Sequence, residues 1–209
     1  LLNLISTRLG LDHQRVLGSR YSLPLMVRYL HQNGGSISTQ EERDKLLYWY
    51  IHTFMWGRYA GSTESYLNVD LEAIRDTASG LDNLITELRT NRGDLRLNSG
   101  DFDGWSKGSR FYPMLYMMTR VQHSIDLVSG VELSGHLLGR SSSLEVHHIF
   151  PKSKLYEHGY SKAEVNAIAN FTFLTKESNL DISNNDPHIY LEEIASRYPG
   201  ALESHWIPM

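Results

Sequence analysis

The sequence contains no cysteine among its 209 residues. Disulfide bonds are therefore excluded, and so are zinc sites that depend on cysteine ligands. The apolar runs are too short to span a bilayer, and no N-terminal stretch has the order of basic, apolar and small residues that is typical of a signal peptide. We therefore expect a cytoplasmic protein without a membrane partner.

The chain also lacks a strong excess of either charge, with 20 basic and 24 acidic residues and a formal net charge of −4. This balance argues against a protein that coats nucleic acid through bulk positive charge, although a local basic patch or a metal ion could still hold DNA. A Gly-rich Walker-type phosphate loop is absent as well. Because the first residue is Leu1 rather than methionine, we expect the chain to be part of a longer protein.

Helical spacing of apolar residues is the main pattern of the first 135 residues. The clearest case follows Thr39 and Glu42, which have the spacing of a capping box and precede apolar positions at helical intervals from Leu47 to Met55. Similar patterns cover residues 21–30, 62–78 and 81–88, and a further stretch begins at Pro113. The sequence therefore predicts a scaffold domain of five or six helices over residues 1–135.

Two adjacent histidines mark a change of pattern in the last part of the chain. His147 and His148 lie in a short β-prone run that is stopped by Pro151. Because neighbouring residues of a regular strand point to opposite faces, the pair can share one site only if the backbone bends there. A strand end close to Pro151 would allow such a bend.

A second β-prone run follows after a loop and begins with an asparagine. It covers residues 170–174, opens with Asn170 and leads into a helical turn that carries Asn179. Two more helices are expected, one after Pro187 and one around residues 201–206. We therefore predict a mainly α protein, in which the helical scaffold is followed by a small α+β domain over residues 136–209.

The order of strand with two histidines, loop, Asn-led strand and Asn-bearing helix resembles the HNH nuclease, or ββα-metal, motif. In this interpretation His148 is the general base that activates water, since a histidine titrates close to neutral pH. His147 and Asn179 hold a divalent metal ion. Asn170 ties down the loop and orients His148, and Glu145, which shares a strand face with His147, is a hydrogen-bond partner of that ligand.

Longer matches are similar to the HNH domain of GmrSD-like and SspE-like modification-dependent restriction proteins. They are EVHHIFPK (145–152), NFTFL (170–174), SNLDISN (178–184), a Pro-x-x-Tyr-Leu segment (187–191) and the closing HWIP (205–208). The resemblance implies an anti-phage DNA endonuclease that nicks or cuts modified DNA. It also implies an N-terminal nucleotide-hydrolysing sensor domain, which we expect to lie outside these residues.

The resemblance leaves two points open. Many HNH sites have a carboxylate where His147 stands, and the paired histidines resemble colicin-type sites instead. We therefore expect Mg²⁺ or Mn²⁺ as the metal, with Ni²⁺ or Zn²⁺ as further candidates. Lys152, Lys154 and Lys176 flank the motif and are candidates for contacts with DNA phosphates, although they could equally be ordinary solvated lysines.

Two functional hypotheses remain at this point. The first is a metal-dependent HNH DNA endonuclease that nicks its substrate. The alternative is a catalytically inactive HNH-like module that binds nucleic acid or a partner domain. None of the other eight histidines is assigned a function, although His158 and His188 lie close to the motif in the sequence. The remaining six are interpreted as surface or packing residues: His13, His31, His52, His123, His136 and His205.

Overall fold

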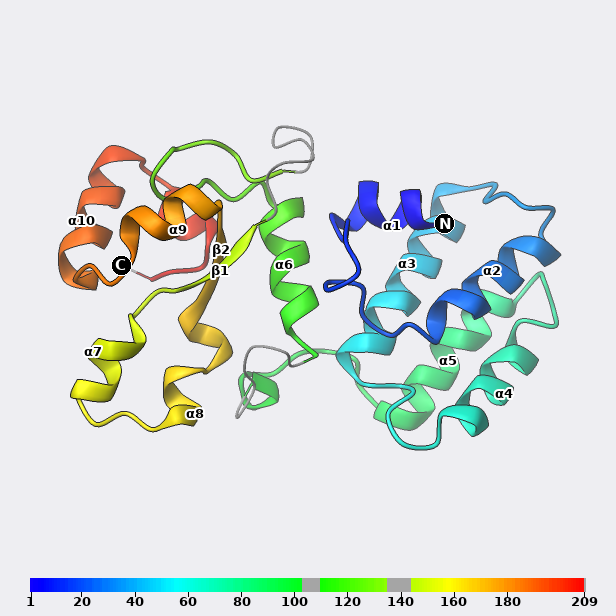
Figure 1. Cartoon of the computed structure of the whole chain (residues 1–209). Helices are drawn as coiled ribbons and strands as arrows, with labels where there is room; N and C mark the ends of the chain where they lie inside the picture. Colours follow the sequence, from blue (N-terminus) through cyan, green and yellow to red (C-terminus); the bar gives the residue numbers. More distant parts are fainter. Residues whose placement is uncertain (103–109, 135–143, 209) are drawn as a thin grey trace. The chain divides into compact units, whose positions relative to one another are not determined.

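The computed structural model describes residues 1–102, 110–134 and 144–208, and within them the protein is mainly helical (Figure 1). The α-helices are α1 (Leu2–Leu9), α2 (Ser22–Gln32), α3 (Gln40–Met55), α4 (Thr63–Ala73), α5 (Gly80–Arg92), α6 (Tyr112–Val121), α7 (Lys152–Glu157), α8 (Lys162–Val165), α9 (Lys176–Ile182), α10 (Pro187–Arg197) and α11 (Ala201–Ser204). Two strands, β1 (Glu145–His148) and β2 (Phe171–Leu174), form a small antiparallel sheet. The predicted mainly α fold with a small α+β part is thus confirmed. In the described residues no helix is both long and apolar enough to cross a membrane.

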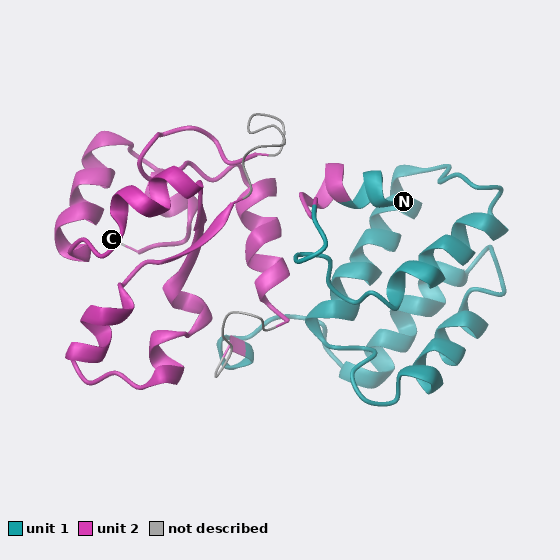
Figure 2. Cartoon of the chain, viewed as in Figure 1, with its two compact units in different colours: residues 1–5, 13–101 teal, residues 6–12, 102–209 magenta. Residues whose placement is uncertain are grey.

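The chain divides into two compact units (Figure 2). Unit 1 comprises Leu1–Ile5 and His13–Asp101, and unit 2 comprises Ser6–Asp12 and Phe102–Met209. The domain boundary predicted from the sequence, between residues 135 and 136, does not coincide with this division. Helix α6 belongs to unit 2, where the rings of Tyr112 and Tyr116 pack edge-on against Phe173 of β2 at 5.1 and 5.0 Å.

The core of unit 1 is formed around α3. Its first turn is capped as predicted, because the Thr39 hydroxyl accepts a hydrogen bond from the Glu42 amide at 3.0 Å. The Glu42 carboxylate in turn accepts from the amide of Ser38, one residue before the expected partner. Trp49 and Tyr50, in the middle of the helix, are fully buried. Apolar burial therefore holds α3 in the centre of this unit.

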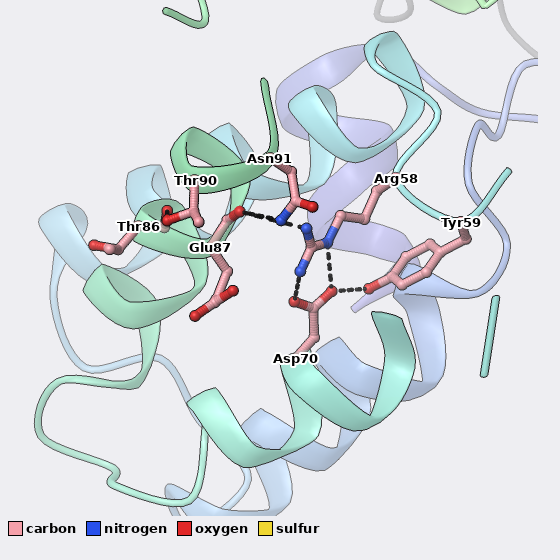
Figure 3. A network of polar contacts seen from close by, with 7 residues as sticks. All are labelled: Arg58, Tyr59, Asp70, Thr86, Glu87, Thr90 and Asn91. Atoms are coloured by element: carbon pink, nitrogen blue, oxygen red, sulfur yellow. Dashed lines mark hydrogen bonds and ion pairs between the residues drawn. The ribbon is translucent and has the colours of Figure 1, made fainter. Parts of the chain in front are cut away.

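A buried ion pair fastens α3 to its neighbours (Figure 3). Arg58, just after α3, donates to both carboxylate oxygens of Asp70 in α4, at 3.1 and 2.6 Å. The Tyr59 hydroxyl donates to the same carboxylate at 2.6 Å, and Arg58 also reaches the main-chain carbonyl of Glu87 in α5. Because a buried charge without a partner would strongly destabilise the fold, this network sets how the three helices meet.

The two-stranded sheet is the centre of unit 2. Glu145 pairs with Leu174 and His148 with Phe171, so the strands predicted from the sequence are confirmed and fully paired. Helix α9 packs against β1 and helix α6 against β2 (Figure 1). An apolar cluster that includes Leu174, Ile182 and Tyr190 joins the sheet to α9 and α10.

The segment between the strands is more ordered than a loop. It contains α7, α8 and a 3₁₀ turn at Ile168–Asn170. Helix α7 has six residues and α8 has four, so both are too short for a periodic pattern to be recognised in the sequence. Local signals do explain them, because Ser161 and Glu164 form a complete capping box at the start of α8. Pro151 is the N-cap residue of α7.

Candidate metal centre

The pairing register assigns the motif residues to two different faces of the sheet. Glu145 and His147 lie on the face that also carries Thr172 and Leu174, since directly paired residues point the same way. This face meets α9 and α10. His148 lies on the opposite face, paired with Phe171.

His147 and Asn179, the two predicted metal ligands, are in direct contact. The Nδ1 atom of His147 lies 2.9 Å from Oδ1 of Asn179, which α9 brings to the sheet from 32 positions further along the chain. The Asn179 amide nitrogen donates to the Glu145 carboxylate at 3.0 Å. The structure thus brings Glu145, His147 and Asn179 together, as the sequence interpretation expected.

This chain of hydrogen bonds defines the tautomer of His147. The bond from Asn179 Nδ2 to a carboxylate fixes which end of the amide faces the imidazole, because a carboxylate only accepts. The amide oxygen therefore faces Nδ1, and Nδ1 carries the proton. The imidazole lone pair is left on Nε2.

Nε2 of His147 is one of several buried side-chain atoms without a hydrogen-bond partner in the described part of the chain. The side chain is 2% exposed, and Nε2 has no hydrogen-bond partner among the residues that the structure describes. Burial lowers the pKa of His147, and the hydrogen bond with Asn179 only partly opposes this shift. The ring is therefore neutral at pH 7, which is the form that binds metal ions.

The donor set fits a divalent cation. An imidazole, an amide and a carboxylate lie in one hydrogen-bonded chain. Because Nδ1–H of His147 points at Oδ1 of Asn179, the free Nε2 lies on the other side of the ring, and a cation held by both side chains must replace the Nδ1 proton. Two or three protein donors leave positions open for water and phosphate, as a catalytic site requires. No group of three or more His, Asp or Glu side chains that could hold a metal occurs in the described part of the chain. The fit therefore depends on Asn179.

His148 has different surroundings from its neighbour. Its ring contacts Phe171 edge-on at a centroid distance of 4.6 Å, and the side chain is half-buried. The strand does end at His148, but the ladder continues with a hydrogen bond from the amide of Ile149 to the carbonyl of Asn170 at 3.0 Å. The bend that would bring both histidines to one face is therefore absent from β1.

Asn170 closes the segment between the strands, as predicted. Its amide oxygen accepts from the Phe150 amide at 2.7 Å, and its amide nitrogen donates to the carbonyls of Phe150 and Val165, both at 3.0 Å. The residue is 7% exposed. It thus fixes the main chain where it leaves β1 and where α8 ends. Its predicted influence on the orientation of His148 stays a prediction.

The sequence analysis missed Asp126, which anchors α9. Its carboxylate accepts hydrogen bonds from the amide and hydroxyl of Thr175, at 3.0 and 3.1 Å, and from the hydroxyl of Ser178. Burial acts to raise the pKa of Asp126, but these bonds and those from Ser129 lower it below its usual value. Since Ser178 directly precedes Asn179, Asp126 fixes the start of the helix that carries a candidate ligand.

His205 supports the sheet through Thr172 of β2, the residue that pairs with His147. Its Nε2 donates to the Ile125 carbonyl at 2.8 Å, so Nδ1 accepts from the Thr172 hydroxyl at 2.5 Å. Burial lowers the pKa of His205 to about 4. The prediction that His205 is a packing residue is consistent with its 4% exposure.

The three candidate DNA-binding lysines lie at two places in unit 2. Lys152 and Lys154 are on α7, and Lys176 is the first residue of α9. Lys152 and Lys176 are exposed, whereas the amino group of Lys154 lies 3.5 Å from the carboxylate of Asp186, the N-cap residue of α10. Their contact with DNA stays a prediction.

Comparison with known proteins gives a distant relative. No protein-family model and no solved structure matches the chain. The chain is similar to Uncharacterized protein MJ0686 of Methanocaldococcus jannaschii, with 27% identity over 156 residues. The aligned region covers 73% of this chain and 26% of that protein, so the chain spans about a quarter of the length of the relative it matches.

Proposed function

We propose that this chain is a metal-dependent HNH-type DNA endonuclease. The observation that carries the proposal is the contact between His147 of β1 and Asn179 of α9, at 2.9 Å. Two side chains with metal-ligand chemistry meet between a strand of a two-stranded sheet and the helix that follows it. This is the arrangement expected for the ββα-metal motif.

The roles of the residues follow from their chemistry. His147 and Asn179 would hold a divalent cation, with Mg²⁺ or Mn²⁺ favoured and Ni²⁺ or Zn²⁺ compatible with an imidazole ligand. When bound, the cation would offset the negative charge that develops on the phosphoryl oxygens. His148 would take a proton from the attacking water. That role requires the end of β1 to turn, since His148 leaves the face opposite to His147.

The motifs resemble those of modification-dependent restriction proteins, and this resemblance suggests a role in defence against phage. The chain would be the C-terminal effector half of a modification-dependent anti-phage restriction protein. A nucleotide-hydrolysing sensor domain of the same protein would direct it to DNA, which Lys152, Lys154 and Lys176 would contact through the phosphates.

A second candidate is a catalytically inactive HNH-like module that binds nucleic acid or a partner domain. The placement of the two histidines on opposite faces of β1 favours this alternative. If His148 cannot approach the cation, the site of His147 and Asn179 would bind metal but would not cleave DNA.

Plasmid relaxation distinguishes the two candidates. Supercoiled DNA is incubated with the 209-residue chain and a titration of Mg²⁺ or Mn²⁺, with and without EDTA. Metal-dependent relaxation that is lost in the His148→Ala variant supports the endonuclease. Product that persists in EDTA excludes the metal mechanism. Absence of product with any of the metals, together with calorimetric metal binding, supports the inactive module.

A further inference from the structure

The segment between β1 and β2 presents an unusual group of aromatic side chains to solvent. Phe150, Tyr156 and Tyr160 are 43%, 47% and 48% exposed. A single exposed aromatic residue needs no explanation, but three within eleven residues are an unusual concentration in one segment. Such a concentration is typical of a binding region.

The same segment has a slight excess of basic residues although the whole chain is acidic. Residues 149–170 contain Lys152, Lys154 and Lys162 and two acidic residues, Glu157 and Glu164. The Asp186 carboxylate lies near Lys154, while Lys152 and Lys162 are exposed. Exposed aromatic rings among lysines match the two parts of a nucleotide, because rings stack on bases and ammonium groups attract phosphates.

Hydrogen bonds hold the backbone that carries these rings. Both main-chain groups of Phe150 are bonded to the buried Asn170 amide. At the end of α7 the Tyr160 amide donates to the Leu155 carbonyl at 3.0 Å, in a turn closed by Gly159 with φ +83°. Lys152 and Tyr156 are four residues apart on α7 and thus share a helix face. A fixed support of this kind lowers the entropy cost of binding.

We propose that the segment 150–162 binds unpaired nucleotides of DNA, with Tyr156 and Tyr160 stacking on bases and Lys152 and Lys162 contacting phosphates. This inference rests on the proposed function, because the choice of DNA as the ligand comes from the proposed endonuclease activity. The bases of an intact duplex are stacked on one another and offer no free face to a tyrosine. The site would therefore favour single-stranded or locally opened DNA.

The test is a binding measurement in EDTA, in which cleavage does not take place. Fluorescence anisotropy compares a labelled 20-nucleotide single strand with the blunt duplex of the same sequence, at one fixed salt concentration. The 209-residue chain should bind the single strand more tightly. Tyr156→Ala and Tyr160→Ala should each weaken this binding by about 5- to 150-fold, the range found for loss of one base–aromatic stack.

Control variants separate stacking from other effects. Tyr156→Phe and Tyr160→Phe keep the ring and should bind as tightly as the parent. Tyr21→Ala removes a tyrosine of unit 1 that is 54% exposed and should change nothing. Equal or tighter binding of the duplex by the parent, unchanged binding in the alanine variants, or no binding of either DNA would overturn the proposal.

Cleavage is measured separately, so that the two proposals can fail independently. Loss of the single-strand preference with intact metal-dependent relaxation would refute only the nucleotide-binding surface. Tyrosine-dependent binding of the single strand without any relaxation would refute only the endonuclease.

Discussion

His147 and His148 are neighbours in the chain, yet their side chains lie in different environments. His147 is buried beside Asn179, whereas His148 lies half-buried against Phe171. The alternation of side chains along a strand produces this separation. The two residues can therefore be tested independently, since a change in one leaves the contacts of the other in place.

The first prediction concerns their roles. If His148 is the general base, as proposed, His148→Ala should lower the rate of DNA cleavage about 10²- to 10⁴-fold, while metal affinity stays near that of the parent. His147→Ala and Asn179→Ala should weaken metal binding, and excess metal should partly restore their rates. Calorimetric metal binding beside metal titrations of cleavage measures both effects. Rescue of His148→Ala by excess metal would mean that the two histidines exchange roles.

The second prediction uses the pKa of His205. Burial lowers this pKa to about 4 from an ordinary value near 6.5, so below pH 6.5 the unfolded chain binds a proton that the folded chain does not. The free energy of unfolding should therefore fall as the pH is lowered, by about 2 kcal/mol from this residue between pH 7 and pH 5. Above pH 6.5 the residue contributes no pH dependence.

Urea unfolding at several pH values checks this expectation. His205→Gln should be less stable than the parent at pH 7, because its bonds to Thr172 and Ile125 are changed, but its stability should fall less between pH 7 and pH 5. His188→Gln changes an exposed histidine and serves as the matched control. A parent whose stability is constant over this range would contradict the assignment.

Among the elements, α9 decides whether the candidate centre exists. It has only seven residues, too few to be stable alone in water, so tertiary contacts must hold it. Thr175 caps it by accepting from the Ser178 amide, and Asp126 binds both residues from another part of unit 2. The position of Asn179 therefore depends on a carboxylate 53 residues earlier in the chain.

The third prediction tests this dependence. Asp126→Asn retains the size of the side chain but removes its charge and one acceptor, which should lower the free energy of unfolding by about 1.5–3 kcal/mol. Metal affinity should fall as well, because α9 is no longer held. Asp181→Asn makes the same change at an exposed position of α9 and should have little effect on either quantity. Unchanged metal binding in Asp126→Asn would show that α9 is positioned by other contacts.

Local signals account for the elements that the sequence predicted. Thr39 caps α3, Asp186 and Pro187 start α10, and the β-prone runs around His147 and Phe173 form the sheet. Each of these depends on residues a few positions apart. The contact between His147 and Asn179 was anticipated only through the resemblance to a known motif.

Long-range contacts explain what the sequence did not predict. Asp126 meets Thr175 across 49 positions, and no spacing rule links them. The division at residue 101/102 depends on how α6 packs against Phe173, which local periodicity does not reveal. The helices α7 and α8 are too short to show a period. The different environments of His147 and His148 depend on the register of the sheet, which pairs His147 with Thr172 and His148 with Phe171.

At the scale of the whole molecule, charge is distributed unevenly. The chain carries a net charge of −4, but three lysines gather in the segment between the two strands. A chain of this kind lacks the bulk positive charge that attracts DNA, so attraction would depend on local basic groups such as these lysines. The salt dependence of binding scales with the number of phosphates that are neutralised. Binding through these few lysines should therefore weaken only modestly with added salt.

The last prediction concerns the number of strands cut in one encounter. The chain carries one His148 and one pair of His147 and Asn179, and one general base with one cation can hydrolyse one phosphodiester bond at a time. A monomer should therefore open supercoiled plasmid to nicked circles, and linear DNA should appear only after independent nicks on opposite strands lie close together. A time course on agarose gels at low enzyme concentration measures this order, with His148→Ala prepared in parallel to detect contaminating nucleases. Linear product that forms first, at a rate rising with the square of the enzyme concentration, would instead require two chains whose sites act together on both strands.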